Sequence, residues 1–211
     1  MIVMPSNHSK GIVHYWAGKN YPVGWLLTPD SSLKTPICNY MPYAIDNGRF
    51  AVWSEGREWN EDNFIKYLDF YCTYELQPRW IVVPDAVGDK NETLEEWKKW
   101  YPSLKEYGVP LAFVVQDGMT KEDVPEDADI IFIGGTFAWK WEKIRYWSEN
   151  FERIHVGRVN TYNHLQTCRS LGVESCDGTG WFRHPDRWKG LEKYFMIESG
   201  EMVEPQLELK I

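Results

Sequence analysis

Short apolar runs recur along the chain, and each of them ends in a polar residue or a glycine. The runs are too short for helices, and near-continuous apolar runs of this length are typical of strands that are buried on both faces. Six runs of this kind lie at residues 43–45, 80–83, 111–115, 130–133, 153–156 and 173–176.

Between these runs lie segments with apolar residues at helical spacing. Segment 60–74 begins with Asn60 as an N-cap and an acidic first turn, and segment 91–107 begins in the same way, although Pro102 is expected to kink or split it. Further helices are expected at 137–150 and 160–171, the latter with Gly172 as its C-cap. Strands and helices therefore alternate from about residue 43 to 180, which predicts an α/β fold with a parallel sheet.

The number of strands favours a closed barrel. Segment 23–27 or segment 11–16 supplies a seventh strand, and segment 194–198 is expected to supply the last. Eight strands in a chain of roughly 200 residues form a barrel near its lower size limit. The rival, a doubly wound open sheet, usually carries a glycine-rich phosphate loop after its first strand, and neither common form of that loop occurs here. We therefore expect one domain, residues 1–211, with the fold of a compact (β/α)8 TIM-like barrel.

Composition agrees with one globular domain and limits the partners. Hydrophobic residues make up 43% of the 211 residues, and the 16% aromatic content, with 12 Trp and 12 Tyr, leaves rings free to stack on a flat ligand. The net charge of −8 does not attract a polyanion at long range, so nucleic-acid binding requires a local basic face.

The cysteines and the first residues indicate the compartment. The four cysteines form no C-x-x-C pair, so no zinc subdomain is expected. The first residues contain neither a long apolar run nor a cleavage signature, so we expect no signal peptide, no membrane anchor and a cytoplasmic location.

The predicted strand ends gather residues that carry chemistry. In parallel α/β folds, the carboxyl ends of the strands converge on one crevice. Each residue taken alone also fits an ordinary turn or cap, but their coincidence at six consecutive strand ends predicts a functional site. Its members are Asp46, Asp85, Gln116, Gly134, Gly135, Arg158 and Asp177.

Paired carboxylates are the chemistry that this set offers. Such pairs provide the nucleophile and the acid/base in reactions at an anomeric carbon. No Ser-His-Asp or Cys-His spacing and no carboxylate–His metal cluster is evident, so no metal and no cofactor is expected. His155 lies within a predicted strand and is interpreted as a packed residue.

Two strand ends resemble a known family. Segment 172–179 (GVESCDGT) resembles the nucleophile segment of the tRNA-guanine transglycosylases, also called queuine tRNA-ribosyltransferases, and segment 44–50 (AIDNGRF) is similar to their acid/base segment. The order and spacing of the motifs over roughly residues 40–183 are closer to a shorter branch, the DpdA-type 7-deazapurine DNA transglycosylases, which bacteriophages often encode.

The resemblance implies a role for each site residue. Asp177 attacks C1′, and Asp46 is the general acid/base. Asp85, Gln116 and the backbone of Gly134 and Gly135 recognise the base. Trp181 or Phe50 stacks on the base, and flanking phosphates are held by Arg158, Arg183 and Lys140.

The resemblance also implies the partners. The chain lacks the three-Cys, one-His zinc site and the basic strip of the tRNA enzymes. This departure favours DNA over tRNA as the acceptor, with a free 7-deazaguanine base such as 7-cyano-7-deazaguanine as the second substrate. A phage-encoded enzyme would act in the host cytoplasm.

Two other functions fit the same residues. A small-molecule barrel enzyme, such as a lyase, isomerase or glycosidase, would use the strand-end carboxylates and hold a phosphate on the loop Gly178-Thr179-Gly180. A non-catalytic module would use the same pocket only to bind a nucleobase.

Overall fold

The strands form a ring of parallel neighbours. The computed structural model describes residues 1–6, 11–29, 37–183 and 186–203. Their sheet has eight strands in the order β1-β8-β7-β6-β5-β4-β3-β2, and every neighbouring pair is parallel. The strands are β1 (Ile2–Met4), β2 (Trp25–Leu27), β3 (Tyr43–Ile45), β4 (Ile81–Val82), β5 (Leu111–Val115), β6 (Ile130–Ile133), β7 (Ile154–Val156) and β8 (Ser175–Asp177).

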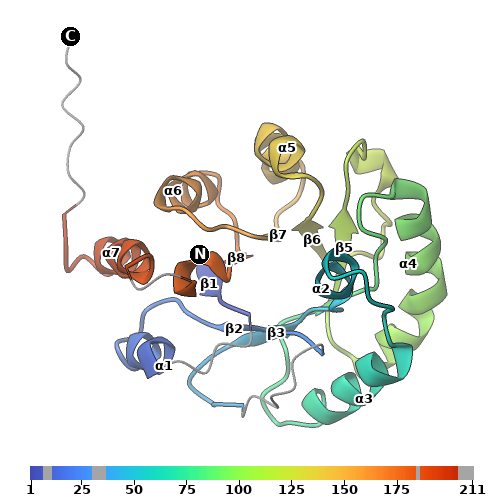
Figure 1. Ribbon diagram of the computed structural model, residues 1–211, viewed down its shortest axis with the longest axis horizontal. Helices are drawn as coiled ribbons and strands as arrows, with labels where there is room; N and C mark the ends of the chain where they lie inside the picture. Colours follow the sequence, from blue (N-terminus) through green and yellow to red (C-terminus); the bar gives the residue numbers. More distant parts are fainter. Residues whose placement is uncertain (7–10, 30–36, 184–185, 204–211) are drawn as a thin grey trace.

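Backbone hydrogen bonds join the two ends of this sheet. The N–H of Val3 donates to the Pro22 carbonyl at 2.9 Å, and the N–H of Gly24 donates to the Val3 carbonyl at 2.9 Å. Helices other than α2 (Arg49–Ser54) lie around the outside of the ring (Figure 1). The predicted compact (β/α)8 TIM-like barrel is therefore confirmed.

The helices occupy most of the crossovers between strands. They are α1 (Gly11–Gly18), α2 (Arg49–Ser54), α3 (Glu61–Tyr71), α4 (Lys90–Leu104), α5 (Phe137–Asn150), α6 (Tyr162–Ser170) and α7 (Trp188–Glu198). The described residues also form three short 3₁₀ turns, which are η1 (Lys105–Tyr107), η2 (Lys121–Asp123) and η3 (Gly180–Phe182). Between β5 and β6 the described chain has only η2 in place of an α-helix, which shortens that crossover.

Two apolar layers follow from the alternation of side chains along each strand. One layer fills the barrel and contains only strand and strand-edge residues, among them Met4, Leu26, Ala44, Val82 and Val114. The other layer lies between the strands and the helices and takes the intervening strand positions. Because successive side chains of a strand point to opposite faces, both layers are buried, and this explains why the strands read as continuous apolar runs.

Three segments near the ends of the chain were predicted as strands, and the structure confirms one of them and corrects the other two. Segment 23–27 does contain β2, whereas segment 11–16 lies in α1, which buries Val13, Trp16 and Ala17 at helical spacing. Segment 194–198 is wrong as a strand because it lies in α7. The missing strand is β1, which was not among the predicted runs.

The helix predictions hold with small shifts at their ends. Asn60 caps α3 by accepting from the N–H of Asn63 at 2.8 Å, and α5 spans the predicted residues 137–150. The cap of α4 is Asp89 rather than Asn91. Pro102 does not split α4, which continues to Leu104; proline removes one backbone donor, and here it does so within the last turn.

Candidate functional site

A cavity of about 750 Å³ opens at the carboxyl ends of the strands. Several residues of its lining lie two positions after a residue that points into the barrel interior. Because side chains alternate along a strand, these residues also point inward, into the mouth of the barrel. The residues placed in this way are Ser6, Thr28, Asp46, Gln116, Gly134 and Asp177. Helix α2 also lines the cavity, with Phe50 and Trp53 exposed on it.

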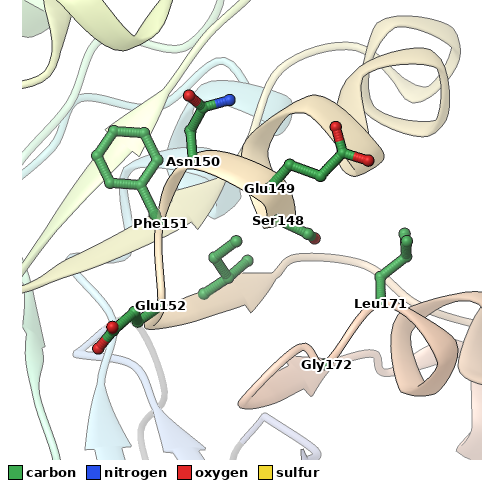
Figure 2. A pocket seen from close by; sticks show the side chains of 8 residues that line it. Ser148, Glu149, Asn150, Phe151, Glu152, Leu171 and Gly172 are labelled. Carbon is green, nitrogen blue, oxygen red and sulfur yellow. The ribbon is translucent and has the colours of Figure 1, made fainter.

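A second cavity, of about 250 Å³, lies at the opposite end of the barrel, where α5 ends and β7 begins. Its two acidic residues are Glu149 and Glu152, and Figure 2 shows their carboxylates pointing in opposite directions. Because these acids do not converge on one point, this cavity does not offer paired-carboxylate chemistry.

Asp177 is held through both oxygens of its carboxylate. It ends β8 and is 7% exposed. Its Oδ1 accepts from the backbone N–H of Arg158 at 3.1 Å, and its Oδ2 lies 3.1 Å from Nε2 of His155. A carboxylate oxygen accepts hydrogen bonds, so this contact suits the tautomer of His155 that carries its proton on Nε2. The arrangement holds the carboxylate in one orientation at the cavity wall.

His155 fills the barrel beneath Asp177. It is 0% exposed, and its ring packs between Trp80 and Phe132 at centroid distances of 4.8 and 4.6 Å. Its Nδ1 lies 2.9 Å from the Ser175 hydroxyl. The interpretation of His155 as a packed residue is confirmed. The Ser175–His155–Asp177 chain was not apparent from the sequence, and because Ser175 is buried below the histidine, it is not arranged as a hydrolytic triad.

Asp46 follows β3 and lines the same cavity as Asp177. Burial, followed by the negative charges of Asp177 and Asp85, raises the pKa of Asp46 to about 7. The backbone N–H groups of Asn47 and Gly48 act in the other direction. Near neutral pH a large fraction of Asp46 therefore carries a proton that it can donate.

Asp85 and Gln116 form a buried polar pair at the next two strand ends. The Asp85 carboxylate accepts from Nδ2 of Asn47 at 2.8 Å and from Nε2 of Gln116 at 2.7 Å. Burial raises the pKa of Asp85, while these two hydrogen bonds and the charge of Arg49 lower it. Asn47 was missed by the sequence reasoning, and its position beside Asp46 was the available signal.

The glycine pair and Arg158 form one side of the cavity. A Cβ on Gly134 would lie 2.7 Å from the Val114 side chain, and Gly135 has a φ of +66°. The Arg158 guanidinium donates to the Gly135 carbonyl and lies 4.5 Å from the centre of the Phe50 ring. Arg158 itself has a φ of +60°, which is strained for a residue other than glycine.

Two residues lie elsewhere than their predicted roles require. Trp181 is 3% exposed, its indole N–H donates to the Val159 carbonyl at 2.7 Å, and it does not line the cavity. Its place in the packed layer outside the strands excludes stacking on a bound base, whereas Phe50 does line the cavity. Lys140 is 1% exposed and donates to the Gly157 carbonyl, so it is not a surface phosphate ligand. Arg183 is exposed and lines the cavity.

Neither a protein-family model nor a curated protein matches the chain. Within the described ranges, no group of three or more His, Cys, Asp and Glu side chains is placed to hold a metal ion. No helix in the described part of the chain is long and apolar enough to cross a membrane. The site is therefore interpreted from its own geometry: one carboxylate held by two donors and one carboxyl that is partly protonated line the same cavity.

Proposed function

We propose that the protein is a base-exchange transglycosylase that replaces guanine in DNA with a 7-deazaguanine such as 7-cyano-7-deazaguanine. The observation that carries this proposal is the pairing of Asp46 and Asp177 in one cavity at the strand ends. A nucleophile that is ionised and an acid that is protonated near pH 7 are what the exchange of a leaving group at an anomeric carbon requires.

The reaction runs in two balanced steps. In the first, the Asp177 carboxylate bonds to C1′ as the bond from C1′ to the base breaks, and the departing guanine takes the bond electrons and a proton from Asp46. In the second, Asp46 removes a proton from the incoming 7-deazaguanine, whose ring nitrogen bonds to C1′ and releases Asp177. Exchange instead of hydrolysis requires that water stay out of the cavity between the steps.

The polar pair recognises the base edge. Guanine donates from its ring N–H and its amino group, and Asp85 accepts such donors, while the Gln116 amide pairs with the remaining polar edge. In the free protein these two side chains bond to one another, so base binding exchanges one hydrogen-bond partner for another. The Gly134 N–H already donates to the Val115 carbonyl, so we assign the backbone contact to Gly135. Phe50 stacks on the base.

The acceptor nucleotide enters by base flipping, because C1′ chemistry on a paired base needs the base outside the stack. The cavity volume of about 750 Å³ is within the range of small-molecule sites and accommodates a base with its sugar. Arg183 at the rim, together with Arg158, supplies local positive charge for the phosphates despite the net charge of −8.

Product analysis tests the reaction. The protein is incubated with a guanine-containing duplex and 7-cyano-7-deazaguanine, the DNA is digested, and the nucleosides are analysed by mass spectrometry. We expect the deazaguanine nucleoside to appear and free guanine to be released in equal amount. Asp177→Asn should abolish the covalent protein–DNA adduct on a denaturing gel, whereas Asp127→Asn, a change at an exposed acid, should leave it unchanged. An adduct that forms with Asp177→Asn would remove this residue as the nucleophile.

The small-molecule alternative is less well supported. Its phosphate loop would use the backbone of residues 178–180, but the Gly180 N–H donates to Oδ1 of Asn160 at 2.7 Å. Thermal unfolding discriminates the functions: oligonucleotide and free deazapurine should each raise Tm under the transglycosylase proposal. A nucleobase-binding module would show the same Tm shifts without product.

A further inference from the structure

Lys140 is a buried cation that the proposed reaction leaves without a role. It lies in the first half of α5 and lines the cavity, yet only 1% of it is exposed. Its Nζ donates to the carbonyl of Gly157. Burying an ammonium group costs free energy unless the group is hydrogen-bonded, so Lys140 needs a hydrogen-bond acceptor in the cavity wall. Since the amine is enclosed and already donates to a carbonyl, its geometry does not suit a nucleophile.

The partner of Lys140 is one end of the peptide group that binds the nucleophile. The Gly157 carbonyl and the Arg158 N–H belong to the same peptide unit, and this N–H donates to Oδ1 of Asp177 at 3.1 Å. Lys140 and Asp177 therefore bind opposite ends of one peptide dipole. Hydrogen bonds in such a chain polarise and strengthen one another in a buried environment.

The backbone at this peptide is strained in the orientation that Asp177 needs. Arg158 has a φ of +60°, and a Cβ on Gly157 would lie 2.8 Å from the Phe132 ring. A rotation of the peptide by half a turn would let Arg158 return to a negative φ, but it would point the carbonyl at Asp177 instead of the N–H. A strained conformation persists only where its surroundings hold it, and Lys140 holds the carbonyl end.

We propose that Lys140 is a positioning residue, which holds the Gly157–Arg158 peptide with its N–H on Asp177 and so orients and stabilises the attacking carboxylate. This role rests on the proposed function for its catalytic consequence, but the contact itself is independent of the reaction. The charged and titratable groups around Lys140 are consistent with this positioning role. Arg158 and Asp177 act on Lys140 with opposite signs, and Cys168 and His164 face it from α6. Burial and the charge of Arg158 lower the pKa of Lys140 to about 7.

The experiment compares Lys140→Met, which preserves length but removes the donor, with Lys140→Gln, which keeps an N–H donor. Lys143→Met is the matched control, because Lys143 lies on the same helix with a side chain that is 43% exposed. Two readouts are taken: the rate of covalent adduct formation with saturating duplex, and the ¹³C chemical shift of the Asp177 carboxyl, assigned from its loss in Asp177→Asn. Tm of each variant verifies folding.

For Lys140→Met we expect the adduct rate to fall at least tenfold and the ¹³C carboxyl resonance of Asp177 to shift, because the Arg158 N–H no longer holds its Oδ1 in place, with the affinity for free 7-cyano-7-deazaguanine within twofold of wild type. Lys140→Gln should recover part of both losses, and Lys143→Met should change neither. An Asp177 carboxyl resonance at the same position in Lys140→Met and wild type would overturn the positioning role. If the wild-type protein forms no adduct, the proposed function fails, while the Asp177 carboxyl resonance still decides whether Lys140 acts on Asp177.

Discussion

Replacing Asp46 with Asn should make the protein more stable at neutral and alkaline pH. The pKa of Asp46 is about 7 in the folded protein, against an ordinary value of 3.8. The unfolded chain therefore loses this proton near pH 4 and the folded protein only near pH 7. Between these values the folded state binds more protons than the unfolded state, so its stability falls as pH rises, and above pH 7 the whole cost is present.

The magnitude follows from the difference between the two pKa values. At about 1.4 kcal/mol for each pH unit, the charge on Asp46 costs at most roughly 4 kcal/mol above pH 7. Asp46 is only partly buried, and water at the cavity mouth reduces this cost, so we expect Asp46→Asn to gain about 1–4 kcal/mol at pH 8. For a chain of this size each kcal/mol corresponds to about 2–4 °C in Tm.

Urea denaturation between pH 4.5 and pH 8 measures this effect. The stability difference between Asp46→Asn and wild type should grow with pH and level off above pH 7, whereas Asp127→Asn, at an exposed position, should change stability by less than about 0.5 kcal/mol. A variant that is no more stable than wild type at pH 8, or a gain independent of pH, would refute the reasoning. The same substitution should stop base exchange, as expected where a functional group is kept at the expense of stability.

Two further predictions concern packing and DNA binding. Gly178→Ala should lower the unfolding free energy by about 2 kcal/mol or more in urea denaturation, because its Cβ would collide with the Val159 carbonyl oxygen. The control is Gly18→Ala, whose Cβ meets no atom within 4 Å and which should be neutral or slightly stabilising. Equal losses of stability in the two variants would contradict the steric argument. Arg183→Ala should weaken DNA binding and reduce the slope of log K against log salt by about 1 in a fluorescence titration. Lys66→Ala, on the outer helix α3, should change neither the affinity nor the slope. An unchanged slope in Arg183→Ala would remove Arg183 from the phosphate contacts.

Much of the site could be located from the sequence because it depends on local rules. Parallel strands bring their carboxyl ends to one side, and the alternation of side chains selects every second residue for the interior. These rules suffice to bring Asp46, Gln116 and Asp177 to the same cavity. The strand β1 was not among the predicted runs, and segment 194–198 was misassigned because a short apolar run has the same appearance in a strand and in a buried helix.

The sequence by itself determined the α/β alternation, the barrel and the polar strand ends. Only the tertiary structure decided that Trp181 and Lys140 are enclosed, that His155 and the Arg158 N–H hold Asp177, and that burial and two neighbouring carboxylates raise the pKa of Asp46 to about 7. The physical reason is that burial and charge act through space: the pKa of a carboxyl depends on the groups that the fold places around it, most of which are distant along the chain.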